Sequence, residues 1–151
     1  MTEGDKCFRM HAENGTVISE TVPDLQCTHE EADTRMLLHA KHAAENGSQS
    51  VVIKTPDTDV EVLAYHFKND IHASLYVLTG TKQRSRFVDI GSVSSKLGRN
   101  MCQALPGLHS MTGCDTTSAF SGKGKAKAFK LVTGDADMCV TMQQLGNGSC
   151  S

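Results

Sequence analysis

Two kinds of hydrophobic pattern run along this chain, and they predict strands and helices in alternation. Continuous apolar runs at positions 51–53 and 75–78 predict buried strands of a parallel sheet. Apolar residues at helical spacing occupy 36–44 and 60–67 and predict amphipathic helices beside those strands. The alternation predicts an α/β domain with a mainly parallel central sheet and flanking helices.

Further elements are predicted toward the two ends of the chain. Short runs at 7–10 and 16–19 flank Asn14-Gly15, a pair that favours the tight turn of a β-hairpin. Beyond residue 132 the chain turns polar and rich in Gly and Ser, so 133–151 are expected to form a flexible tail. A short strand and three helices are predicted over 87–90, 93–105, 108–112 and 126–132.

Composition and charge narrow the functional classes. A chain of 151 residues with 38% hydrophobic content can bury the core of one domain. Its 15 Lys and Arg against 17 Asp and Glu give a net charge of −2, so any surface for nucleic acid must be local.

No apolar stretch approaches the roughly 20 residues of a membrane span, and no signal-peptide segment opens the chain. We therefore expect an intracellular protein, nuclear or cytoplasmic and not secreted, with no membrane partner. Its six cysteines lack metal-binding spacing and are expected to be reduced.

The strongest candidate site residues are Asp57 and Asp59, which come directly after the apolar run at 51–53. In α/β folds, sites form beyond the carboxyl ends of such strands. If the backbone stays extended there, residues two apart point to the same face, about 7 Å apart, and can share a metal cluster. The alternative is that Asp57-Thr58-Asp59 only caps the start of a helix. The spacing leaves both interpretations open.

Two further acidic clusters carry Glu31, Asp33 and Asp115. Glu31 and Asp33 open a predicted helix, where carboxylates also simply complement the helix dipole. Asp115 follows Gly113 at a helix-to-loop transition, where it can equally belong to a polar turn. Carboxylates repel one another, so a fold that gathers several of them usually holds divalent cations. These clusters therefore predict a site for divalent metal ions.

A glycine- and lysine-rich segment follows the third acidic cluster. A Gly-x-Gly turn lets the backbone approach a phosphate, and lysines attract polyanions over a longer range. The alternative is an ordinary solvated helix face. The segment predicts contacts to nucleic acid from Gly122, Lys123, Gly124, Lys125 and Lys127.

The order of these motifs resembles the flap endonuclease/XPG branch of the PIN-like nucleases. The similarity runs from about residue 28 to 132, roughly two thirds of the chain. Residues 29–35 and 108–118 also resemble a group of animal proteins found in repetitive gene families. The motifs that carry the resemblance to the nucleases are Glu31-Ala32-Asp33, Asp57-Thr58-Asp59, Gly113-Cys114-Asp115 and the segment 120–128.

The resemblance implies a three-layer PIN-like fold and a metal-dependent nuclease. Residues 1–132 would form a partial nuclease domain, with a helix-turn-helix-like segment at 120–132 that grips nucleic acid, DNA rather than RNA. Two ions, Mg²⁺ or Mn²⁺, would activate water and stabilise the leaving oxygen. Their ligands, which would also be the catalytic residues, would be Glu31, Asp33, Asp57, Asp59 and Asp115.

This sequence departs from the family pattern near its start. The family begins with a strand that carries an aspartate, and a second aspartate precedes the Glu-Ala-Glu motif. Here Asp5 and Asp24 do not stand in matching contexts, and the clamp that threads single-stranded flaps is absent. We therefore expect a fold that is incomplete at the N-terminus. The alternative function is a non-catalytic nucleic-acid-binding or protein-interaction module that retains the fold.

Overall fold

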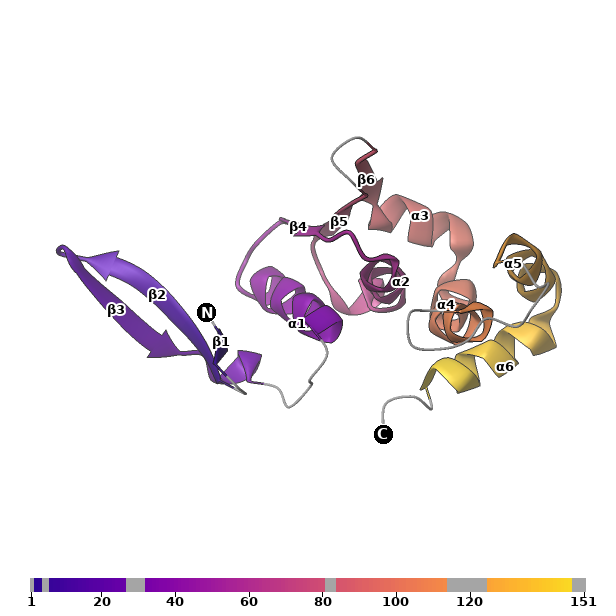
Figure 1. The fold of residues 1–151 in the computed structure, drawn as a ribbon, viewed down its shortest axis with the longest axis horizontal. Helices are drawn as coiled ribbons and strands as arrows, with labels where there is room; N and C mark the ends of the chain where they lie inside the picture. Colours follow the sequence, from indigo (N-terminus) through magenta and orange to yellow (C-terminus); the bar gives the residue numbers. More distant parts are fainter. Residues whose placement is uncertain (1, 4–5, 27–31, 81–83, 114–124, 148–151) are drawn as a thin grey trace.

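A computed structural model describes residues 2–3, 6–26, 32–80, 84–113 and 125–147 of the chain (Figure 1). These residues form two three-stranded sheets and six α-helices. The strands are β1 (Thr2–Glu3), β2 (Lys6–Glu13), β3 (Thr16–Thr21), β4 (Ser50–Lys54), β5 (Ser74–Thr79) and β6 (Arg86–Asp89). The helices are α1 (Ala32–Glu45), α2 (Thr58–His66), α3 (Ile90–Leu97), α4 (Arg99–Thr112), α5 (Lys125–Gly134) and α6 (Ala136–Asn147), with 3-10 turns η1 (Pro23–Leu25) and η2 (Lys68–Asp70).

The N-terminal hairpin was predicted correctly. β2 and β3 pair antiparallel around Asn14 and Gly15, whose φ angles of 50° and 79° suit the tight turn expected there. The hairpin extends away from the helices, and η1 joins it to the rest of the chain (Figure 1). At its base, the Val22 amide donates to the Cys7 carbonyl at 2.8 Å, and the Cys7 side chain is buried.

The second sheet has the order β4-β5-β6. β4 and β5 are parallel, with α2 in the crossover between them, whereas β6 pairs antiparallel with β5. The predicted α/β class is therefore confirmed, and the strands expected at 51–53 and 75–78 are present. The strand expected at 87–90 is β6, which lies one residue earlier because Ile90 begins α3. The sheet is mixed, because one of its two strand pairs is antiparallel.

One face of this sheet carries the main core. Leu75 and Val77 point toward the helices and are 1% and 0% exposed. On the opposite face, Val52 and Phe87 are 54% and 61% exposed. The alternation follows from the two-residue period of a strand. Among the described residues the sheet thus has one covered face, and the third layer of the expected fold is not seen.

The helical region after β6 differs from the prediction in its boundaries. Gly98 has a φ of 79° and separates α3 from α4, so the helix expected over 93–105 is broken there. α4 instead continues through Pro106 to Thr112, which joins the two helices expected at 93–105 and 108–112. Glycine at a positive φ ends helices readily, because it has no Cβ to clash.

The expectation of a flexible tail was wrong for Ala136–Asn147, which form α6. Met142 on α6 and Val132 on α5 are buried against Leu108 of α4, in a second hydrophobic cluster. α6 crosses α4 so closely that a Cβ added at Gly107 would overlap the Met142 carbonyl oxygen. The apolar residues of α6 have helical spacing, a signal that the Gly and Ser content near the chain end obscured. Residues 148–151 lie outside the described residues.

Candidate metal centre

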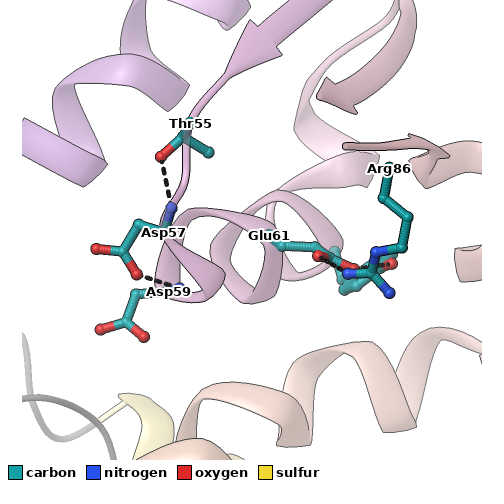
Figure 2. A network of polar contacts seen from close by, with 6 residues as sticks. Thr55, Asp57, Asp59, Glu61 and Arg86 are labelled. Atoms are coloured by element: carbon teal, nitrogen blue, oxygen red, sulfur yellow. Dashed lines mark hydrogen bonds and ion pairs between the residues drawn. The ribbon is translucent and has the colours of Figure 1, made fainter. Parts of the chain in front are cut away.

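Asp57 and Asp59 lie where β4 leads into α2, as the sequence predicted (Figure 2). The backbone amide of Thr55 still pairs with the sheet, donating to the Leu78 carbonyl at 3.0 Å. The Thr55 hydroxyl oxygen then accepts from the Asp57 amide at 3.1 Å. Asp57 has extended backbone angles and is the N-cap of α2, because its Oδ1 accepts from the Asp59 amide at 2.9 Å. The capping alternative is therefore correct for Asp57.

The cap does not exclude a metal site, because a third carboxylate joins the pair. Asp33 stands in the first turn of α1. This helix runs antiparallel to β4, so it begins near the end of β4 from which the chain continues to Asp57 and Asp59 (Figure 1). Asp33, Asp57 and Asp59 each offer a carboxylate oxygen, and these atoms lie within 4.8 Å of one another. All three side chains are half-buried. We call these three residues the acidic cluster.

A second Asp-x-Asp motif shows that this local sequence can cap a helix without forming a metal site. Asp135 precedes α6 and its Oδ1 accepts from the Asp137 amide at 3.0 Å, the same capping geometry as Asp57 with Asp59. Both residues are exposed. No further acidic side chain joins them in a metal-sized group within the described part of the chain. The capping motif is thus common to both places, and only the approach of α1 makes one of them a cluster.

The acidic cluster has the donor chemistry of a hard divalent cation. Mg²⁺ binds oxygens at about 2.1 Å, so two of its direct ligands lie at most roughly 4.2 Å apart. The carboxylate oxygens of the cluster lie within 4.8 Å of one another, a limit slightly above this distance. One carboxylate would then bind the ion through a water molecule instead of directly, and Mg²⁺ usually keeps several waters. The three carboxylates can therefore hold an ion, partly through water.

His109 was not identified from the sequence, yet it contacts the acidic cluster. Its Nε2 lies 2.5 Å from Asp59 Oδ1, and the two side chains are 14% and 30% exposed. An ionised carboxylate only accepts hydrogen bonds, so this nitrogen carries the hydrogen. His109 stands in the last turn of α4, 50 residues from Asp59. The only sequence signal was its position one helical turn before the Gly113-Cys114-Asp115 motif.

The structure places only two of the other predicted site residues. Glu31, Asp115, Gly122, Lys123 and Gly124 lie outside the described residues. Lys125 begins α5, and Lys127 on the same helix is exposed. The helix expected after the Gly/Lys segment is confirmed, whereas its contacts with nucleic acid remain a prediction.

The nearby carboxylate of Glu61 has a structural role. It lies on α2 but points away from Asp57 and Asp59, toward Arg86 (Figure 2). Its Oε1 accepts from the Tyr65 hydroxyl at 2.9 Å, and its Oε2 accepts from Arg86 at 2.7 Å. Burial, and then the Glu61 carboxylate, raise the pKa of the Tyr65 hydroxyl, so it stays protonated and keeps donating. Glu61 is therefore not part of the acidic cluster.

Comparisons with known proteins add no further constraint. No protein-family model, curated protein or solved structure matches this chain. Among the described residues, no helix is long and apolar enough to cross a membrane. The resemblance to PIN-like nucleases therefore stays a prediction, and the acidic cluster with its surroundings is the main basis for a functional proposal.

Proposed function

We propose that this chain is a nuclease-like domain of the PIN-like class, which uses Mg²⁺ or Mn²⁺ to hydrolyse phosphodiester bonds in nucleic acid, DNA rather than RNA. The observation that carries the proposal is the convergence of Asp33, Asp57 and Asp59 from the starts of two helices. Capping accounts for Asp57 but not for the approach of Asp33, which comes from another helix. Three carboxylates within reach of one ion are enough to hold Mg²⁺, which usually takes one or two carboxylates together with waters and substrate phosphates.

The acidic cluster would hold the ion, and two further acidic residues can complete it. When bound, the ion would supply an activated water and stabilise the leaving oxygen. Glu31 is two residues from Asp33 in the sequence. Asp115 follows the end of α4, and His109 in the last turn of that helix already touches Asp59. Four residues of helix span only about 6 Å, so the chain leading to Asp115 starts close to the cluster.

The packing of the lysine-bearing helix α5 supports the proposal that the domain binds a polyanion. α5 packs against α4, the helix whose last turn contacts the acidic cluster. Lys127 is exposed on α5, and Lys123 and Lys125 precede it in the sequence. Such lysines would hold the phosphate backbone without reading its sequence.

A second candidate function is a non-catalytic interaction module that retains the fold. The observation that favours it is the exposed apolar face of the β4-β5-β6 sheet. Phe87 is 61% exposed and stacks on Tyr76 with ring centroids 5.0 Å apart, beside the exposed Val52. Contiguous apolar surface of this kind often marks a binding site for another macromolecule.

Mn²⁺ titration calorimetry tests the leading proposal. We expect saturable binding to the parent chain and its loss in an Asp57→Asn/Asp59→Asn variant. The matched control is Asp135→Asn/Asp137→Asn, which changes the same number of charges in the same capping geometry and should leave binding intact. Absence of binding by the parent, or equal loss in both double variants, would reject the metal site.

A cleavage assay then separates the two candidate functions. Labelled single-stranded and double-stranded DNA and RNA would be incubated with Mn²⁺ and the parent chain or the Asp57→Asn/Asp59→Asn variant. Cleavage that the variant lacks would support the nuclease. Mn²⁺ binding without cleavage of any substrate would favour the non-catalytic module for the chain as it stands.

A further inference from the structure

We infer that His109 is the positioning residue of the acidic cluster: its imidazole anchors one oxygen of Asp59 and thereby orients the other oxygen for the metal. The inference rests on the proposed metal-dependent function. It assigns a role to a side chain that lies 50 residues from its partner and belongs to none of the acidic motifs.

The hydrogen bonds around the acidic cluster divide its oxygens into two sets. Asp57 Oδ1 accepts from the Asp59 amide, and Asp59 Oδ1 accepts from His109 Nε2. Among the described residues, neither Asp57 Oδ2 nor Asp59 Oδ2 has a hydrogen-bond donor. Each aspartate is therefore held by one oxygen while its second oxygen stays available. For Asp57 the anchor is the backbone, whereas for Asp59 it is His109.

His109 acts through Asp59 and is not itself a ligand. Its ring nitrogens are not among the atoms that lie within 4.8 Å of one another in the cluster. The nitrogen that faces Asp59 carries a hydrogen, and a protonated nitrogen cannot coordinate a metal. The coordinating atoms thus remain carboxylate oxygens, which suit Mg²⁺ and Mn²⁺. Hydrogen bonds to metal ligands of this kind fix their orientation, and removing them commonly weakens metal binding 10- to 100-fold.

Packing makes His109 an effective anchor. The His109 side chain is 14% exposed, and α4 packs against α2 through buried Cys102 and the main core. An imidazole with two rotatable bonds, confined between packed helices, loses little further entropy when it holds Asp59. A purely structural hydrogen bond between α4 and α2 would have the same geometry. If His109 positions Asp59 for the metal, metal affinity depends on the donated hydrogen. If its role is purely structural, only stability does.

The test compares Mn²⁺ affinity by calorimetry at pH 7.5 for the parent, His109→Leu and His109→Gln. Leu has a similar volume and no donor, whereas the Gln side-chain amide can place an N–H near the position of Nε2. We expect 10- to 100-fold weaker binding in His109→Leu and recovery of most of the affinity in His109→Gln. His72→Leu, at an exposed site before β5, is the matched control and should bind like the parent. Urea unfolding of each variant verifies that it is folded during the titration.

The outcomes separate this inference from the proposal beneath it. If the parent binds Mn²⁺ and His109→Leu binds with the same affinity, the positioning role is wrong and the metal site stands. Equal weakening in the folded Leu and Gln variants would also overturn it, since the donated hydrogen would then not matter. If His109→Leu does not fold, His109→Gln decides: parent-like affinity supports the role, and a loss of more than tenfold contradicts it. If the parent fails to bind, the proposed function fails and takes the inference with it.

Discussion

Glu61 on α2 and Arg86 on β6 form an ion pair of 2.7 Å between a nearly buried carboxylate and a mostly exposed guanidinium. The two side chains are 12% and 64% exposed. The second carboxylate oxygen accepts from the buried Tyr65 hydroxyl at 2.9 Å, so both oxygens of Glu61 have partners. Because these partners lie on the side of α2 that faces β6, Glu61 is directed away from Asp59, although the two residues are only two positions apart.

We predict that Glu61→Ala lowers the free energy of unfolding by about 1–3 kcal/mol, because the buried Tyr65 hydroxyl then lacks its acceptor. Arg86→Ala should cost less, about 1 kcal/mol or below, because the guanidinium is mostly exposed and such a partner adds little net stability to an ion pair. Urea unfolding of both variants gives the two values. An equal or larger loss in Arg86→Ala would show that the ion pair, and not the Tyr65 hydrogen bond, carries the stabilisation.

Asp57 combines a capping role with a proposed metal-binding role, and two substitutions separate them. Asn caps helices about as well as Asp, so Asp57→Asn should leave stability within about 0.5 kcal/mol while weakening Mn²⁺ binding. Asp57→Ala should lose about 1 kcal/mol of stability as well. Thermal unfolding and calorimetry on the same samples measure both effects. Full Mn²⁺ affinity in Asp57→Asn would leave Asp57 as a cap alone.

The crossing of α4 and α6 depends on Gly107. We predict that Gly107→Ala destabilises the protein by about 1–3 kcal/mol, because the added methyl overlaps the Met142 carbonyl and forces the helices apart. Gly134→Ala on α5 is the control, since a Cβ there meets no described atom within 4 Å. That change should be neutral or stabilise by up to about 1 kcal/mol. Urea unfolding curves that rank the two variants in the opposite order would contradict the close crossing.

Stability should also depend on pH through His66. Burial lowers the pKa of this imidazole, against smaller opposing effects of Asp70 and the Gln103 backbone, and its Nδ1 is buried without a hydrogen-bond partner among the described residues. The folded state therefore favours neutral His66, whereas the unfolded state takes up a proton near pH 6.5. The contribution of neutral His66 to the free energy of unfolding is fully present above that pH. It is lost as the pH falls from about 6.5 through the lower pKa that His66 has in the folded state.

We predict that the urea midpoint of the parent decreases between pH 7.5 and pH 5.5, and that His66→Gln reduces this decrease. Part of the decrease should remain, because burial also lowers the pKa of His39. Hydrogen bonds from Ser92 are the main cause that lowers the pKa of the Asp89 carboxyl. Its protonation therefore changes stability only below about pH 3.8, outside the range of this experiment. His72→Gln, at an exposed position, is the control. The same pH dependence in His66→Gln as in the parent would exclude His66 as its source.

Local elements of this fold were predictable from short stretches of sequence. The runs at 51–53 and 75–78 became the parallel pair β4 and β5, and Asn14-Gly15 became the hairpin turn. Such features depend on residue preferences and periodicity within a few positions, which the sequence displays directly. The same information identified Asp57 and Asp59 at the end of a strand, but it could not separate capping from metal binding.

The sequence by itself determined the N-terminal hairpin, the strands β4 to β6, the helices α1 and α2, and which residues carry acidic groups. Only the tertiary structure decided that Asp33 lies with Asp57 and Asp59, that His109 holds Asp59, and that α6 docks on α4 at Gly107. Each of these contacts joins residues that are at least 24 positions apart, from Asp33 to Asp57, and up to 50 positions apart. They depend on how whole helices pack over a common core, and no local pattern specifies which helix ends will meet.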